Sequence, residues 1–196
     1  MALDILITGV GGQGILSIAT IIGRAAIAGG LHLKQSEVHG MAQRGGAVQS
    51  HLRLSETPIW SDLIPRGGAG MILAMEPMEA LRYLDWLSPD GWVIANTVAV
   101  PNLAAYPPVD DLLAEIRKLR HHVLLDALQA ARQSGAPRAV NVAMLGAASP
   151  FLGLPVEALE ASIREQFARK GQDVADGNLV VFRAARAAAL RDTGRA

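Results

Sequence analysis

Three glycines near the N-terminus have the spacing of a phosphate-binding loop. Gly9, Gly11 and Gly14 follow the pattern G-x-G-x-x-G, and Gly12 and Gln13 separate the last two. In such a loop the first glycine permits a tight turn, the second lets a ligand approach the backbone, and the third lets a helix pack closely on a strand. A purely structural tight turn can carry the same glycines. We favour a phosphate or carboxylate site over that alternative.

A second stretch, from Ser36 to Gly46, combines a carboxylate, an imidazole, an amide and a guanidinium. Its candidate binding residues are Glu37, His39, Gly40, Gln43, Arg44, Gly45 and Gly46. Arg44 offers a planar, permanently charged fork that suits a carboxylate or a phosphate. The alternative is a polar surface loop held by its own hydrogen bonds. Because loops with such side chains commonly carry function, we favour a role in an interface or in ligand binding.

Glu37 lies 23 residues after Gly14, close to where dinucleotide-binding folds place the acid that binds a ribose hydroxyl. That spacing favours NAD. The residues that follow Glu37 do not resume a clean helical pattern, so the simple dinucleotide-binding pattern breaks at this point.

Several other chemistries are excluded or disfavoured by composition. The chain has no cysteine, so it has no disulfide, no thiolate and no cysteine ligand for an iron–sulfur cluster. No G-x-S-x-G elbow precedes a helix, which disfavours a self-sufficient hydrolase. No histidine pair has metal-binding spacing on an expected helix, and we therefore expect no metal site.

The glycine pattern needs a strand before it and a helix after it, and the sequence offers both. Residues 5–8 are apolar except for Thr8, which predicts a strand, and residues 15–28 are apolar nearly all round, which predicts a helix buried on most faces. The free N–H groups at the start of that helix, with the helix dipole, favour an anion. A strand over 31–38 would complete a strand–helix–strand unit, with both candidate loops facing one crevice.

The connection to the next strand predicts a mixed sheet. Residues 47–54 alternate apolar and polar side chains, which is typical of a half-exposed strand. Only the eight residues from His39 to Gly46 precede this strand, whereas a parallel crossover needs about a dozen or more. We therefore expect this strand to be antiparallel to a neighbour.

Strands and helices alternate through the rest of the chain. Strands are expected at 71–75, 92–96 and 122–126, and helices at 77–87, 112–119, 127–134, 137–149, 156–167 and 178–190. The small residues of 137–149 predict a helix packed close to another backbone. We expect a turn at 88–91, a surface excursion at 101–108 available to another chain, and fraying from Arg186 onward. The predicted fold is a single α/β domain over 1–196, a three-layer Rossmann-like sandwich with a mixed, mostly parallel sheet.

Charge and hydropathy restrict the partners and the location. The 196 residues are 51% apolar and 18% charged, with a formal net charge of zero. No global field draws such a chain to nucleic acid or to anionic lipid. No basic flank precedes the first apolar run, and no apolar stretch approaches the roughly 18 residues of a membrane span. We expect a cytoplasmic protein that binds neither nucleic acid nor membrane.

The two motifs together resemble one family. Gly9-Val10-Gly11-Gly12-Gln13-Gly14, followed by the stretch from Ser36 to Gly46, is similar to the gamma subunit or domain of the 2-oxoacid:ferredoxin oxidoreductases. The nearest match is the beta subunit of the indolepyruvate:ferredoxin oxidoreductases. The resemblance covers most of the chain, with Glu76-Pro77 and residues 141–146 also in family-like positions, and the paired motifs are far more specific than the glycines alone.

The resemblance implies a division of labour between subunits. The complex would decarboxylate an aryl-2-oxoacid such as indolepyruvate, reduce ferredoxin and release an acyl-coenzyme A. Thiamine diphosphate and 4Fe-4S clusters would lie on a large partner subunit. This chain would bind no cofactor alone, would be inactive alone, and would contribute its two loops to the coenzyme A crevice and the subunit interface. A homodimer is an option for the isolated chain.

A free-standing NAD-binding module or dehydrogenase is the alternative function. It would use the same glycines and Glu37. It leaves unexplained the second loop, the lack of a separate substrate domain and the lack of an acid–base pair. The sequence leaves open which residues are catalytic, which 2-oxoacid is used and how many subunits assemble.

Overall fold

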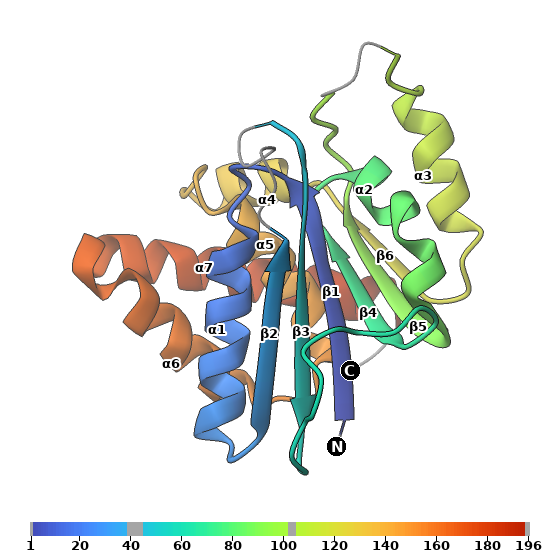
Figure 1. Ribbon diagram of the computed structural model, residues 1–196. Coiled ribbons are helices and arrows are strands. Elements are labelled where there is room, and N and C mark those ends of the chain that lie inside the picture. The colour runs from blue at the N-terminus through green and yellow to red at the C-terminus, as the bar shows by residue number, and fades with distance from the viewer. Residues whose placement is uncertain (1, 39–44, 102–104, 195–196) are drawn as a thin grey trace.

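The computed structural model describes residues 2–38, 45–101 and 105–194. The described chain forms a six-stranded sheet with helices on both faces (Figure 1). The strands are β1 (Ala2–Val10), β2 (His32–Val38), β3 (Ala47–Ser55), β4 (Ala69–Ala74), β5 (Leu87–Asn96) and β6 (His122–Leu125). Within these described ranges, no helix has the length and apolar character needed to cross a membrane.

The sheet is mixed, as the short connection before β3 predicts. Its strand order is β2-β3-β1-β4-β5-β6. Strand β3 is antiparallel to both β1 and β2, and the pairs β1–β4, β4–β5 and β5–β6 are parallel. The order also corrects the simple strand–helix–strand unit expected at the N-terminus, because β3 inserts between β1 and β2.

Helices cover the two faces unequally. One face packs against α1 (Ile15–Ala28), α5 (Val140–Ala148) and α7 (Gln172–Asp192), while α6 (Val156–Phe167) packs on α1 and α7, and α4 (Ala127–Gln133) packs on α5. The other packs against the short helices α2 (Pro77–Arg82) and α3 (Val109–Arg117). Three 3-10 turns complete the described structure: η1 (Leu84–Trp86), η2 (Ser149–Phe151) and η3 (Ala168–Lys170).

Alternation along β1 connects it to both cores. Ile5 and Ile7 lie in the larger cluster with α1, α5 and α7, whereas Leu6 lies in the smaller cluster with α2 and α3. All three side chains are fully buried. A strand buried on both faces with helices on each side makes the three-layer α/β sandwich expected from the sequence.

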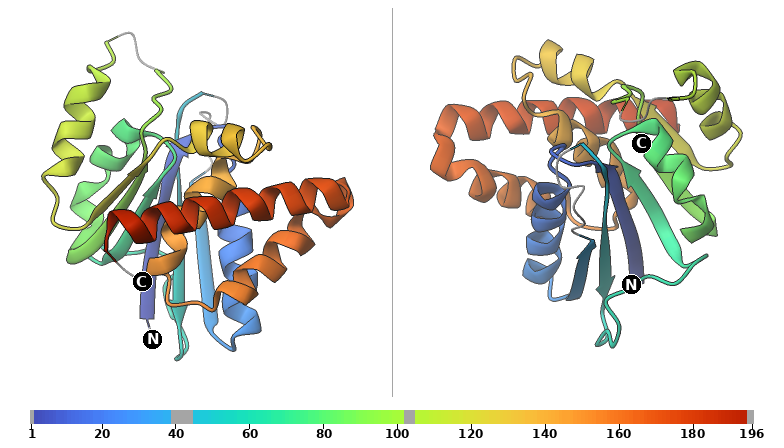
Figure 2. Two further views of the ribbon diagram at one scale, coloured as in Figure 1. Left: turned by 180° about the vertical axis from the view of Figure 1, so that it is seen from behind. Right: turned by 45° about the horizontal axis from the view of Figure 1, so that its top comes forward.

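The long helix α7 crosses the back of the molecule and packs on α5 (Figure 2, left). A Cβ on Gly146 of α5 would collide with the carbonyl oxygen of Phe182 in α7 and approach the Cβ of Ala185 at 3.0 Å. The prediction that this segment packs close to another backbone is confirmed, because only glycine permits that approach.

Several expected boundaries are wrong. The helix after Pro77 ends at Arg82, and β5 starts at Leu87 and includes the residues expected as a turn. A register irregularity accommodates them, since Ala69 pairs with Leu87 but Met71 pairs with Trp92. Helix α7 starts at Gln172 and runs to Asp192, so the expected fraying from Arg186 is also wrong: Ala189 is 2% exposed and holds the last turn.

Candidate functional site

The carboxyl ends of β1 and β4 form a topological switch point. Strand β1 leads into α1 on one face of the sheet, and the parallel neighbour β4 leads into α2 on the other face. Because these two connections leave the sheet in opposite directions, they leave a crevice between them, which is where open α/β sheets bind ligands. The glycine loop, residues 9–14, lies at this crevice (Figure 2, right).

The glycine loop uses left-handed backbone where the sequence supplies glycine. Gly12 has φ 102° and Gly14 has φ 80°, and Gly14 is the N-cap of α1. No described side chain caps α1, and its first turn contains no acidic residue. The first intrahelical bond runs from the Ser17 N–H to the Gly14 carbonyl, and the N–H groups of Gly14, Ile15 and Leu16 have no hydrogen-bond acceptor among the described residues. This end of α1 suits an anion.

Gln13 fastens the loop to both strands of the switch point. Its Oε1 accepts a hydrogen bond from the Val10 N–H at 2.7 Å, and its Nε2 donates to the Met75 carbonyl at 3.1 Å. One amide thus satisfies a donor at the end of β1 and an acceptor just beyond β4. Gln13, predicted as a binding residue, is placed here to fix the shape of the loop.

Two glycines of the pattern lie where a side chain would crowd its neighbours. A Cβ on Gly9 would lie 2.7 Å from the Gln13 Oε1 and 3.0 Å from the Met75 Cβ. A Cβ on Gly14 would lie 2.8 Å from the Asn141 Nδ2, which donates a 3.4 Å hydrogen bond to the Gly14 carbonyl. The pattern therefore has a structural role here that holds with or without a ligand.

A pocket of about 320 Å³ opens beside the loop. Its lining includes Gly12, Gln13 and Gly14 from one side and Arg138, Val140 and Asn141 from the other. Those last residues lead into α5, whose first turn has no acidic residue; there the Asn141 Oδ1 accepts a hydrogen bond from the Val142 N–H at 3.0 Å. The start of α5 therefore adds a second positive helix terminus to that of α1.

Arg138 is the functional candidate that the sequence analysis missed. It is exposed, and it forms no ion pair with any described residue. It also borders a second hollow of about 630 Å³, whose wall includes Phe167, Lys170 and Val174. The only sequence signal was the family-like position of the neighbouring residues 141–146.

The end of the second predicted loop lies against the first. The Gly11 N–H donates to the Gly46 carbonyl at 2.9 Å, and the Gly45 N–H donates to the Gly11 carbonyl at 3.4 Å. Gly11, Gly45 and Gly46 are therefore brought together by an extension of the β1–β3 pairing. His39, Gly40, Gln43 and Arg44 lie outside the described residues.

Glu37 lies two strands from the glycine loop, on the edge strand β2. Its Oε1 accepts a hydrogen bond from the Gln35 Nε2 at 2.5 Å, and Gln35 also reaches the Ser50 hydroxyl at 3.4 Å. A dinucleotide-binding fold needs its ribose-binding acid at the end of the strand beside β1. The insertion of β3 therefore argues against the NAD alternative.

Two buried carboxylates lie just beyond the crevice and were not foreseen. Glu76 and Glu79 are both 0% exposed. Glu76 caps α2 by accepting a hydrogen bond from the Glu79 N–H at 3.0 Å, and it also accepts from the Val100 N–H at 3.4 Å and from the Tyr106 hydroxyl. Glu76 thereby binds residues on both sides of 102–104, the part of the expected surface excursion that lies outside the described residues.

The titration of this cluster follows from burial. Burial raises the pKa of the Glu79 carboxyl, and the guanidinium of Arg82, 3.1 Å away, opposes that shift. Burial and the hydrogen bond to Glu76 raise the pKa of Tyr106, so its phenol keeps the proton that it donates. Each buried acid has a named partner, as a structural role requires.

An amide in the next strand completes the edge of the sheet. The Asn96 Nδ2 donates to the Met75 carbonyl at 3.2 Å, and its Oδ1 accepts from the Ala127 N–H at 3.2 Å. The Met75 carbonyl therefore receives one amide from each side, from Gln13 and from Asn96. In the described part of the chain, no three His, Asp or Glu side chains are grouped as metal ligands would be.

Comparison with known proteins identifies the family. The model of the family described as "Pyruvate ferredoxin/flavodoxin oxidoreductase" matches residues 4–188. The chain belongs to this family. Indolepyruvate oxidoreductase subunit IorB of Archaeoglobus fulgidus is 39% identical over 183 residues, which is 89% of this chain and 90% of that protein. 2-Oxoglutarate synthase subunit KorC of Methanothermobacter thermautotrophicus is 26% identical, with 93% of each chain covered.

Solved structures show the same fold. A keto/oxoacid ferredoxin oxidoreductase gamma subunit from Geobacter sulfurreducens matches with a TM-score of 0.72 at 23% identity, covering 96% of this chain and 99% of that one. The 2-oxoglutarate:ferredoxin oxidoreductase from Magnetococcus marinus matches with a TM-score of 0.77 at 21% identity. The match covers 97% of this chain and 31% of that one, so our chain spans about a third of that protein.

This member of the pyruvate ferredoxin/flavodoxin oxidoreductase family is a gamma-type subunit of a 2-oxoacid:ferredoxin oxidoreductase complex. The resemblance stated from the two sequence motifs is thereby confirmed, and so is the expectation of an oxidoreductase subunit.

Proposed function

We propose that this gamma-type subunit serves an indolepyruvate-type enzyme. Four curated relatives named as indolepyruvate oxidoreductase subunits are 36% to 39% identical to the chain. Relatives named as 2-oxoglutarate synthase or pyruvate/ketoisovalerate oxidoreductase subunits are 26% to 28% identical. The reaction would decarboxylate an aryl-2-oxoacid, reduce ferredoxin and release the acyl group as a coenzyme A thioester.

The crevice of the glycine loop would bind an anionic part of coenzyme A against the partner subunit. The observation that carries this proposal is the pocket beside Gly12 and Gly14, which joins the N-terminus of α1, where no described side chain forms a cap, the N-terminus of α5 and the exposed Arg138. Backbone N–H groups at a helix start and a guanidinium fork are the donors that diphosphates prefer. Coenzyme A would supply the thiol that accepts the acyl group.

Within that crevice the residues divide into two roles. Gly12 and Gly14 would let phosphate oxygens approach the backbone, and Arg138 would neutralise them. Gln13 and Asn141 would act as positioning residues, because their amides hydrogen-bond the loop to β4 and to α5. From the second loop, Glu37, His39, Gly40, Gln43, Arg44, Gly45 and Gly46 remain the proposed contacts to the coenzyme or the partner.

The other cofactors of the complex would belong to a large partner subunit. An iron–sulfur cluster does not fit this chain, because the sequence contains no cysteine to hold it. Thiamine diphosphate and the 4Fe-4S clusters are therefore assigned to the partner, which would pass electrons to ferredoxin. A large partner also fits the Magnetococcus marinus enzyme, in which a domain of this fold is part of a chain about three times as long.

Reconstitution tests this proposal. The purified chain and the purified large subunit should each fail to reduce ferredoxin with indolepyruvate and coenzyme A, and their mixture should do so. Substituting 2-oxoglutarate or pyruvate for indolepyruvate tests the substrate class. Turnover by the chain alone, or a mixture that prefers 2-oxoglutarate, would overturn it.

A calorimetric titration with NADH separates this proposal from the dehydrogenase alternative. We expect binding no tighter than roughly millimolar, about 4 kcal/mol, because Glu37 lies on the edge strand and is engaged by Gln35. Micromolar affinity would favour the dehydrogenase.

A further inference from the structure

A second surface is built around an exposed tryptophan. The Trp60 loop, residues 56–68, connects β3 to β4 and crosses the front of β1 in Figure 1. The Trp60 side chain is 93% exposed, and that of Leu63 is 53% exposed. Leaving a large aromatic side chain in water gives up the free energy that its burial would contribute to folding.

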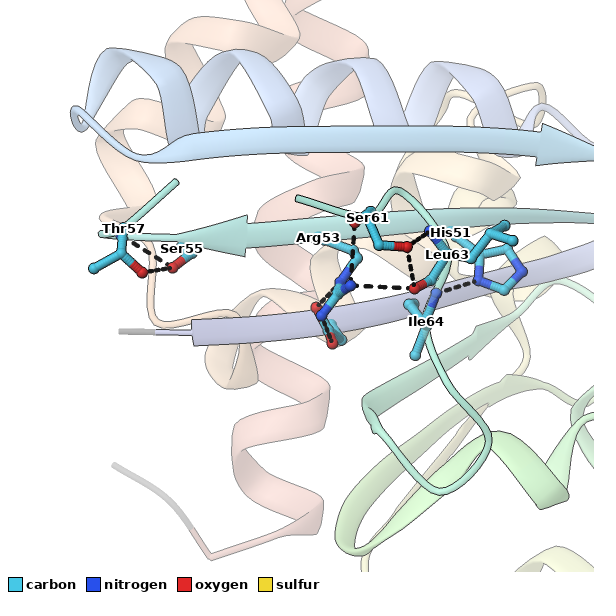
Figure 3. A network of polar contacts seen from close by, with 8 residues as sticks. His51, Arg53, Ser55, Thr57, Ser61, Leu63 and Ile64 are labelled. Carbon is cyan, nitrogen blue, oxygen red and sulfur yellow. Dashed lines mark hydrogen bonds and ion pairs between the residues drawn. The ribbon is translucent and has the colours of Figure 1, made fainter. Parts of the chain in front are cut away.

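Arg53 of β3 holds the first half of this loop in place. Its guanidinium forms two hydrogen bonds to the Asp4 carboxylate on β1, at 2.9 and 3.0 Å. Its Nη1 also donates to the carbonyls of Ser61 and Leu63, at 3.1 Å each (Figure 3). The residue after Trp60 is thus tied to the sheet through a charge-assisted network.

The second half is held by a buried histidine and by η1. The Nδ1 of His51 accepts a hydrogen bond from the Ile64 N–H at 3.1 Å, and Ile64 is 3% exposed (Figure 3). Further along, the Gly67 N–H donates to the Asp85 carbonyl at 2.8 Å. The loop is therefore ordered without any help from the side chain of Trp60.

The sheet beside this loop is uncovered. In the described structure, no helix lies over the front of β2 and β3 in Figure 1. His32 and Lys34 on β2 are exposed there, and Arg53 and Ser55 of β3 are partly exposed. An ordered loop with an outward aromatic, next to an open polar sheet face, has the apolar centre and polar rim of a protein interface.

We propose that the Trp60 loop is a docking anchor, with the Trp60 indole inserting into an apolar pocket of the large subunit. This rests on the proposed function for the identity of the partner. The complex supplies that partner, and in the Magnetococcus marinus enzyme a domain of this fold is about a third of one longer chain. Because Arg53 and His51 order the loop in advance, association loses little loop entropy, which is the condition under which one aromatic contributes most.

Binding to the large subunit tests the anchor. Trp60→Ala should weaken the affinity of the chain for the large subunit by at least about 10-fold, the loss typical of a central aromatic contact. Trp60→Phe should retain most of the affinity. The matched control is Val180→Ala on α7, whose side chain is 51% exposed and far from the loop in sequence. It should bind as the wild type does, and all three variants should keep the wild-type melting temperature.

Acrylamide quenching gives a second measurement. The Trp60 fluorescence, taken as the difference between wild type and Trp60→Phe, should be accessible in the free chain and protected in the complex. Wild-type affinity for Trp60→Ala, or unchanged quenching on assembly, would overturn the anchor while leaving the proposed function intact. If the wild-type chain does not bind the large subunit, both are overturned. If Trp60→Ala lost self-association but kept its affinity for the large subunit, the loop would instead be a contact between two copies of this chain.

Discussion

The glycine loop follows the carboxyl end of β1 and the Trp60 loop crosses the front of that strand, and in each a polar side chain binds the loop to the sheet. Gln13 holds the glycine loop with one donor and one acceptor, at Val10 and Met75. Arg53 holds the Trp60 loop with a guanidinium that reaches a carboxylate and two carbonyls. The first loop turns backbone toward a pocket, and the second turns an indole toward solvent. The contrast separates a site suited to a small anion from a surface suited to a protein.

Removing Arg53 should have the largest effect on stability. Arg53→Ala should lower the free energy of unfolding by roughly 2–4 kcal/mol, because it leaves the Asp4 carboxylate and two loop carbonyls without their donor. Urea denaturation measures the change. Arg53→Lys keeps the positive charge but lacks the planar guanidinium, so its free energy of unfolding should lie between those of the wild type and Arg53→Ala. A loss below about 0.5 kcal/mol for Arg53→Ala would show that the Trp60 loop is not held as described.

Adding a methyl group to the glycine loop should lower the free energy of unfolding slightly less than Arg53→Ala does. Gly14→Ala should destabilise by roughly 2–3 kcal/mol, since φ is 80° and the new Cβ would meet the Asn141 amide. Gly30→Ala is the matched control, because φ is 77° there and nothing lies within 4 Å of a Cβ. It should cost only the backbone strain, roughly 1–2 kcal/mol. Equal losses of stability in the two variants would show that Asn141 does not restrict a side chain at position 14.

The contrast between predicted and unpredicted features has a physical origin. The strand, glycine loop and helix over residues 2–28 could be predicted, because apolar runs and glycines report local structure. The length of one connection was enough to predict an antiparallel strand. It could not say that β3 would insert between β1 and β2, because a short connection restricts direction and not order.

The boundaries of α7 and the burial of two acidic residues could not be predicted, for a different reason. Polar residues at the start of α7 hide its helical pattern, and its packing on α5 overrides their low propensity. Glu76 is buried because Tyr106 and Val100 come from a distant segment to meet it. Arg138 reaches the pocket by the same kind of long-range placement. None of these partners can be read from local spacing.

Acid should weaken the Trp60 loop before it affects the glycine loop. Burial lowers the pKa of His51 below 6.5, Arg53 lowers it further, and Asp62 and Asp4 oppose the shift. The unfolded chain therefore takes up this proton first, and stability falls as pH drops below about 6.5, by at most about 1.4 kcal/mol per pH unit. Thermal unfolding between pH 5 and 7 measures it. His51→Gln should remove this part of the slope, and an unchanged slope would contradict a neutral, buried His51.

Arg138 should have the smallest effect on stability and the clearest effect on function. Arg138→Ala should change the free energy of unfolding by less than about 0.5 kcal/mol, because the side chain is exposed and has no ion-pair partner among the described residues. Arg132→Ala, an exposed arginine on α4, is the matched control. Chemical denaturation of the isolated chain should show both variants within error of the wild type.

The most direct test of the central claim is the coenzyme A dependence of the reconstituted enzyme. With saturating indolepyruvate and ferredoxin, Arg138→Ala should raise the KM for coenzyme A by about 10-fold or more, the loss of one charge-assisted contact to a phosphate. Arg132→Ala should keep the wild-type value. A wild-type KM for Arg138→Ala would contradict the claim that this crevice holds the anionic part of the coenzyme.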